Sequence, residues 1–161
     1  MASFEEHIQK ATSNLKFLEQ SNLKLQDYWD WQVTTTFYVA VHVVNAHLAR
    51  VSDLHYRTHE HVKNAINPLR RTAEAAVNEE IYLCYVKLES LSRRSRYLCH
   101  ESKGEASAAH QTYDVHFTKA IKCLDKILDF FCTQHSITSI PVVTVKSPDL
   151  STRNGLKYFS V

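Results

Sequence analysis

Residues that favour turns are scarce in this chain, with only two glycines and three prolines among 161 residues. Sheet proteins and loop-rich proteins need many such residues, because glycine supplies positive φ and proline fixes φ at bends. Their scarcity therefore favours long helices joined by few connections. Hydrophobic residues make up 44% of the chain, which is enough for one domain of this length to form its own core.

Apolar residues recur every three or four positions in four long segments, as on one face of a helix. These segments cover approximately 4–21, 27–50, 72–98 and 109–134, and Thr58 is expected to cap a short helix that ends near Pro68. Ser3 and Glu6 have the spacing of a capping box at the start of the first helix. We therefore predict an all-α, up-and-down bundle of four long helices and one short helix over residues 1–135.

The same periodicity predicts which residues face the core. In the segment 27–50 these are Trp29, Val33, Phe37, Ala40, Val44 and Leu48. In the segment 72–98 they are Ile81, Cys84, Leu88, Leu91, Ser95 and Leu98. In the last helix they are Tyr113, Phe117, Ile121, Leu124, Leu128 and Phe131.

The composition changes after His135. Residues 137–145 are rich in β-branched side chains and are interrupted by Pro141, and the remainder is polar. We expect residues 136–161 to form an extended C-terminal tail, and both a short strand docked on a partner and partial disorder remain open for it.

Charge and cysteine content exclude several classes of protein. The formal net charge is +2, so any nucleic-acid site must be a local basic cluster. The four cysteines form no CxxC pair and are expected to be reduced thiols in helices. No apolar run approaches the roughly 18 residues of a membrane span, and the N-terminus has no signal-peptide pattern. We expect a soluble, cytoplasmic protein that does not contact membranes.

One cluster near the end of the third long helix could carry chemistry. It consists of Arg93, Arg94, Arg96, Tyr97 and His100. At about 100° per residue, all but Arg94 fall on the face opposite the core residues, and Arg94 lies on the flank of that core face. Arginine offers forked donors to phosphate, and imidazole transfers protons near neutral pH. A solvated basic face at a helix C-terminus, where cations complement the helix dipole, explains the same residues without any chemistry.

Ten histidines raise the question of a metal site. His55 and His59 are four residues apart, and His42 and His47 are five apart, but no cysteine or carboxylate completes a ligand pattern. No metal site is expected. His42 lies close to the inner face of its helix and is expected to be a core histidine with a hydrogen-bond partner.

The basic cluster is similar to a motif of the HEPN family, whose members are short helical bundles, usually dimeric, with an Arg-x(4–6)-His motif before the final helix. Six residues separate Arg93 from His100 and five separate Arg94 from His100, so either arginine fits the motif. Three residues separate Arg96 from His100, which does not fit.

Further stretches resemble one bacterial branch of that family. They are Asp30–His42, His55–His59, Tyr85–Leu88 and Ser92–Tyr97. The resemblance covers approximately residues 5–135 and leaves the tail unexplained.

The resemblance implies a metal-independent endoribonuclease of toxin–antitoxin or antiviral defence type, which cleaves RNA through attack of the ribose 2′-hydroxyl. In that role His100 is the general acid/base, and Arg93 or Arg94 stabilises the phosphorane. Arg96 and Tyr97 hold the RNA backbone. No cofactor is required.

The partners implied are RNA, a second copy of the chain in a homodimer with a composite site, and an antitoxin or nucleotidyltransferase protein. Two other interpretations fit the same residues. One is a non-catalytic HEPN module that binds a partner protein or a nucleotide through this surface, and the other is a structural helical dimer whose basic face has no function.

Overall fold

The computed structural model of the chain describes residues 2–56, 58–97, 112–150 and 155–161. Within these residues it contains α1 (Phe4–Lys24), α2 (Trp29–Ser52), α3 (His59–Ala65), α4 (Glu79–Tyr97) and α5 (Asp114–His135), with two-residue strands β1 (Val143–Thr144) and β2 (Phe159–Ser160). This confirms the predicted all-α class, with four long helices and one short one. No helix in the described part of the chain is long and apolar enough to cross a membrane.

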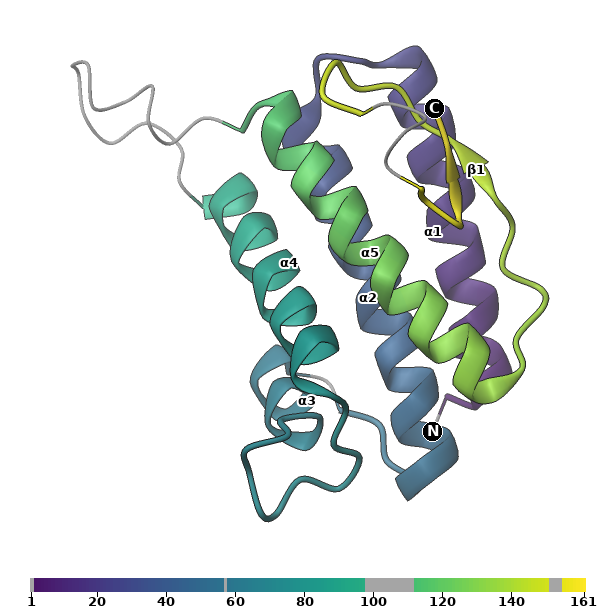
Figure 1. Cartoon of the computed structure of the whole chain (residues 1–161), viewed down its shortest axis with the longest axis vertical. Coiled ribbons are helices and arrows are strands. Elements are labelled where there is room, and N and C mark those ends of the chain that lie inside the picture. Colours follow the sequence, from purple (N-terminus) through teal and green to yellow (C-terminus); the bar gives the residue numbers. More distant parts are fainter. Residues whose placement is uncertain (1, 57, 98–111, 151–154) are drawn as a thin grey trace.

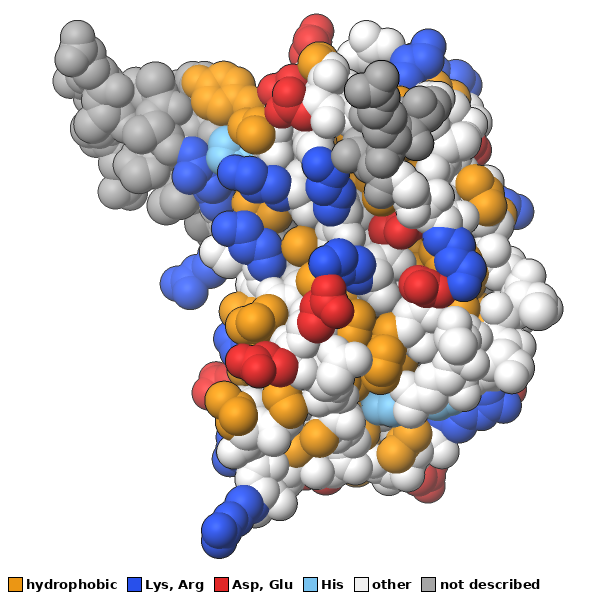
Figure 2. All heavy atoms as spheres, in the orientation of Figure 1, with side chains coloured by type: hydrophobic (Ala, Val, Ile, Leu, Met, Phe, Trp, Pro, Cys, Tyr) orange, Lys and Arg blue, Asp and Glu red, His pale blue; other side chains and the backbone are white. Residues whose placement is uncertain are grey.

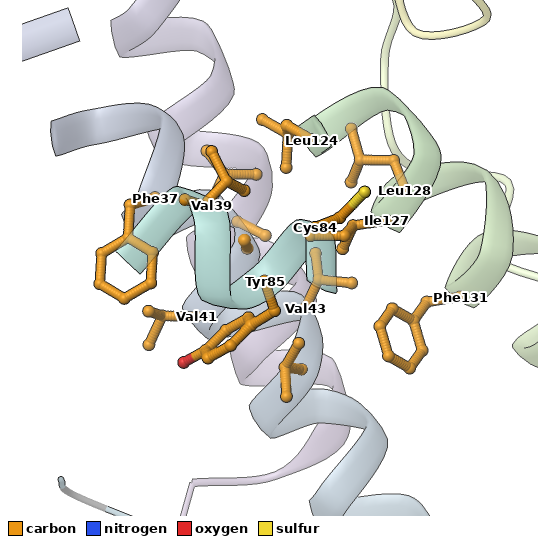
Figure 3. Close-up of a cluster of buried hydrophobic side chains, with 14 of the residues drawn as sticks. Phe37, Val39, Val41, Val43, Cys84, Tyr85, Leu124, Ile127, Leu128 and Phe131 are labelled. Atoms are coloured by element: carbon orange, nitrogen blue, oxygen red, sulfur yellow. The ribbon is translucent and has the colours of Figure 1, made fainter. Parts of the chain in front are cut away.

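The central element is α2, which contacts α1, α4 and α5, while α4 and α5 pack side by side (Figure 1). An element with three helical neighbours has little surface left for solvent. Accordingly Val39, Val41 and Val43 are buried in addition to the predicted face of α2 (Figure 3). Of that predicted face, Phe37 is fully buried, and Trp29 is half-buried against Phe117 at a ring distance of 5.5 Å.

Side-chain caps fix the beginnings of two helices where the sequence predicts them. The Ser3 hydroxyl accepts from the Glu6 amide at 3.2 Å, and the Glu6 carboxylate accepts from the Ser3 amide at 2.6 Å. The Thr58 hydroxyl accepts from the His61 amide at 3.3 Å at the start of α3. Each cap satisfies amide groups that have no partner within the helix.

The predicted start of the third long helix, near residue 72, is wrong, because this helix is α4 and begins at Glu79. Two backbone hydrogen bonds attach the preceding segment to the end of α3, from the Ala75 amide to the Ala65 carbonyl at 3.0 Å and from the Val77 amide to the Ile66 carbonyl at 3.1 Å. The helix then starts after Asn78, whose side chain accepts from an amide of the first turn at 2.9 Å. Tertiary pairing therefore overrides the helical tendency of residues 72–78.

The last helix begins later than residue 109. Tyr113 precedes the first residue of α5 and is 42% exposed, so its predicted place in the core is wrong. The other predicted core residues of α5 are fully buried: Phe117, Ile121, Leu124, Leu128 and Phe131.

The described part of the tail packs on the bundle of its own chain, against α1 and α5 (Figure 1). There β1 pairs with β2 in parallel, with Val143 opposite Phe159. Asn22 of α1 holds both sides of Lys146, accepting from its amide at 2.6 Å and donating to its carbonyl at 2.9 Å. From α5, Asp125 accepts from the amide of Tyr158 at 2.8 Å.

Candidate functional site

A hollow of about 620 Å³ lies between α4 and α5, and we call it the basic pocket. Its lining from α4 is Lys87, Ser90, Leu91, Arg93 and Arg94, and its lining from α5 is His116 and Lys119. Figure 2 shows Lys and Arg side chains gathered over these two helices. Four cationic side chains thus surround one hollow in a chain whose net charge is only +2.

Helical spacing explains how two helices supply these side chains. On α4, Lys87, Ser90 and Arg94 are three and four residues apart, so they project from one face. On α5, His116 and Lys119 are three residues apart within the first two turns. The start of α5 carries the positive end of the helix dipole, which adds to the attraction of the lysines and arginines for an anion.

His116 contributes a hydrogen-bond donor to the pocket. Its Nδ1 accepts from the Tyr113 amide at 3.0 Å, so the proton of the neutral ring is on Nε2. Burial, and next the charge of Arg94, lower the pKa of His116 below the usual value of 6.5. At neutral pH the ring is therefore an uncharged donor, suited to holding a phosphate oxygen and unsuited to accepting a proton through Nε2.

The structure places two of the predicted site residues together at the basic pocket. Arg93 is exposed and Arg94 is half-buried, and both line it. Both arginines that fit the Arg-x(4–6)-His spacing thus share one hollow. His100 lies outside the described residues.

Arg96 lies on another side of α4 and does not line the basic pocket. Its guanidinium is 6.0 Å from the centre of the Tyr38 ring of α2, and its charge adds to burial in lowering the pKa of His59. Tyr97 is the last residue of α4. The single basic face that the sequence suggests for Arg93 and Arg96 is therefore divided between two sides of the helix.

The sequence did not single out four polar lining residues, namely Lys87, Ser90, His116 and Lys119. Lys87 had a weak signal, because it lies seven residues, or two turns, before Arg94. His116 and Lys119 had none, since they reach the pocket only through the packing of α5 against α4.

A second group of polar side chains links α1, α2 and the segment after α2. His7 Nδ1 lies 3.2 Å from His42 Nδ1, and His7 Nε2 lies 3.0 Å from His55 Nδ1. The two nitrogens of His7 thus face different rings and do not converge on one point. Among the described residues no group of three or more His, Cys, Asp or Glu side chains could hold a metal ion. Burial lowers the pKa of His42 to about 4, so this ring is uncharged at neutral pH.

Comparison of the chain with protein-family models, with curated proteins and with solved structures finds no match. The basic pocket is therefore the feature of the chain that points most directly to a function.

Proposed function

We propose that the chain is a metal-independent endoribonuclease whose basic pocket binds a phosphate of the RNA backbone. The observation that supports this is the convergence of Lys87, Arg93, Arg94 and Lys119, with the neutral donor His116, on one hollow. Guanidinium groups match two phosphate oxygens at once, and they stabilise the charge that develops on a phosphorane. A local cluster of this kind suits a polyanion better than an uncharged ligand.

The chemistry requires one group that moves a proton. RNA supplies its own nucleophile, the 2′-hydroxyl, and cleavage through it leaves a 2′,3′-cyclic phosphate and a 5′-hydroxyl. We assign the proton transfer to His100, because the HEPN resemblance gives it that role and because His116 keeps its Nδ1 engaged. His116 then holds a phosphate oxygen, and Arg93 and Arg94 stabilise the developing charge.

A homodimer completes this proposal. One arginine–histidine motif per chain is a sparse site, and a two-fold axis that brings two motifs together supplies more charge and a second proton-transfer group. In such a dimer the basic pockets of the two copies bind neighbouring phosphates of one RNA.

A non-catalytic binding module is the second candidate. The observation that favours it is the hydrogen bond to His116 Nδ1, which leaves the described lining of the basic pocket with cations and donors but without a general base. Such a pocket holds a phosphate-bearing ligand and does not cleave it.

Cleavage of single-stranded RNA in the presence of EDTA tests the proposed function. We expect the wild type to cut, and the products to end in 2′,3′-cyclic phosphate and 5′-hydroxyl. His100→Ala should abolish cutting and keep RNA binding, while Lys16→Ala, an exposed α1 lysine, should behave as wild type. If the wild-type protein binds RNA but leaves it intact, the nuclease proposal is wrong and the binding module takes its place.

A further inference from the structure

A second hollow of about 780 Å³ continues the basic pocket along α4 and α5, and we call it the apolar pocket. Its apolar lining is Leu83, Cys84, Val86 and Cys123. Lys87 and Ser90 line both hollows, so the two adjoin, and we call them together the groove. Glu79 and Glu80 lie at the far end of the apolar pocket, at the start of α4.

The groove therefore changes in chemistry along its length, from cationic through apolar to acidic. Leu83 is 55% exposed at the apolar pocket, so its side chain offers apolar surface to an occupant. On α4, Leu83 is four residues before Lys87, which is a rise of about 6 Å. The two residues are therefore one helical turn apart on the same side of α4, and one small occupant can contact both side chains.

We propose that the two hollows form one nucleotide subsite, with the phosphate in the basic pocket and the nucleobase in the apolar pocket. This rests on the proposed function in so far as the basic pocket binds phosphate. A nucleotide separates its phosphate from its base by a single ribose, which suits the short step from Lys87 to Leu83. The faces of the base are apolar and lie against Leu83 and Val86.

The acidic end of the groove selects among bases. Carboxylates accept hydrogen bonds from exocyclic amino groups, as Glu does from the amino group of cytosine. Glu80 also holds Lys126 at 2.6 Å, in a pair whose side chains are both more than half exposed. Glu79 and Glu80 therefore favour adenine or cytosine over uracil, which has no amino group.

Two other occupants fit the groove less well. An anionic amphiphile would bring its alkyl end against the carboxylates of Glu79 and Glu80 and strip water from them. A second copy of the chain seated in the groove itself would fill the basic pocket and exclude the phosphate that the proposed function places there.

Binding of small ligands to the full chain tests the subsite. Adenosine 5′-monophosphate should bind about tenfold more tightly than ribose 5-phosphate, and uridine 5′-monophosphate should lie between them. Leu83→Asn should lower the affinity for the adenine nucleotide to that for ribose 5-phosphate, without changing the latter. The matched control is Leu69→Asn, which replaces an 82% exposed leucine outside the groove and should change neither.

Alkylation of the two thiols in the apolar pocket gives an independent measurement. The hydrogen bond between Cys84 and Cys123 lowers the pKa of the Cys84 thiol and raises that of Cys123. Adenosine 5′-monophosphate should slow iodoacetamide labelling of the peptides that contain these two cysteines, and ribose 5-phosphate should not. Because each peptide is identified by mass, labelling at the other cysteines does not interfere.

Three results would overturn the subsite. They are equal affinities for adenosine 5′-monophosphate and ribose 5-phosphate, binding of dodecyl phosphate through Leu83 without binding of the nucleotide, and a Leu83→Asn variant that changes only the sedimentation of the protein. Failure of the proposed nuclease is distinguishable from all three. In that case RNA stays intact, while the preference for the adenine nucleotide and its loss in Leu83→Asn persist.

Discussion

At the scale of single residues, Lys119 offers the most direct test of phosphate binding at the basic pocket. It lines the pocket from α5, whereas Lys122, three residues further on, is exposed and is not part of the lining. We expect Lys119→Ala to weaken binding to single-stranded RNA and to reduce the slope of log affinity against log salt by about 0.7, the value for one lost phosphate contact. Fluorescence anisotropy at several salt concentrations measures both quantities. Lys122→Ala is the matched control, and equal losses in the two variants would show that the pocket has no special role.

Two histidines, of which His47 is buried and His42 half-buried, make the stability of the fold depend on pH. Burial lowers the pKa of His42 and of His47 to about 4, whereas in the unfolded chain both rings titrate near 6.5. Between these values the unfolded state binds more protons, so stability is fully present above about pH 6.5 and is lost progressively as the pH falls towards 4. Each ring contributes at most about 3 kcal/mol.

Urea unfolding at several pH values tests this dependence. Between pH 7.5 and pH 5 the free energy of unfolding should fall by about 2–4 kcal/mol. The double variant His42→Gln, His47→Gln should show a shallower slope, whatever its stability at pH 7.5. A flat profile in the wild type would mean that neither ring is buried as the structure has it.

At the scale of elements, Asn22 joins the tail to α1. Its buried amide satisfies the amide and carbonyl of Lys146 and also donates to Gln32 at 2.9 Å. Asn22→Ala leaves these groups without partners, so we expect a cost of about 1–3 kcal/mol and faster hydrogen exchange around β1. Gln20→Ala, an exposed change in the same helix, is the control. Unchanged exchange at Lys146 would show that Asn22 does not hold the tail.

The helices also show how much of the fold can be predicted from the sequence alone. Periodicity was sufficient for most of α5, because its buried residues repeat every three or four positions. In α2 it found one face but missed Val39, Val41 and Val43, which are buried because helices pack on several sides of α2. It failed at the start of α4, where the Ala75 and Val77 amides pair with α3, a contact that local pattern does not contain. The residues of the candidate site also differ in how well the sequence predicts them. Arg93 and Arg94 stand out as a local cluster, whereas His116 enters only through the packing of α5 on α4.

At the scale of the whole molecule, the proposed RNA cleavage requires two copies of the chain. In the proposed function each chain binds a phosphate in its basic pocket, and the composite site for RNA cleavage needs a second copy. Sedimentation should give about twice the chain mass of 18.6 kDa at tens of micromolar protein. A strict monomer that still cleaves RNA would contradict the composite site and would mean that one basic pocket is sufficient for cleavage.

The central claim is that the basic pocket stabilises a phosphate during RNA cleavage, and the single-turnover cleavage rate of Arg94→Ala in EDTA tests it most directly. The loss of one charge-assisted contact corresponds to roughly 1.5–3 kcal/mol, so the rate should fall about 10- to 150-fold relative to wild type. The circular dichroism spectrum should stay helical, and Lys16→Ala, on α1, should cut as wild type does. An Arg94→Ala variant that is fully folded and cleaves RNA at the wild-type rate would contradict the claim.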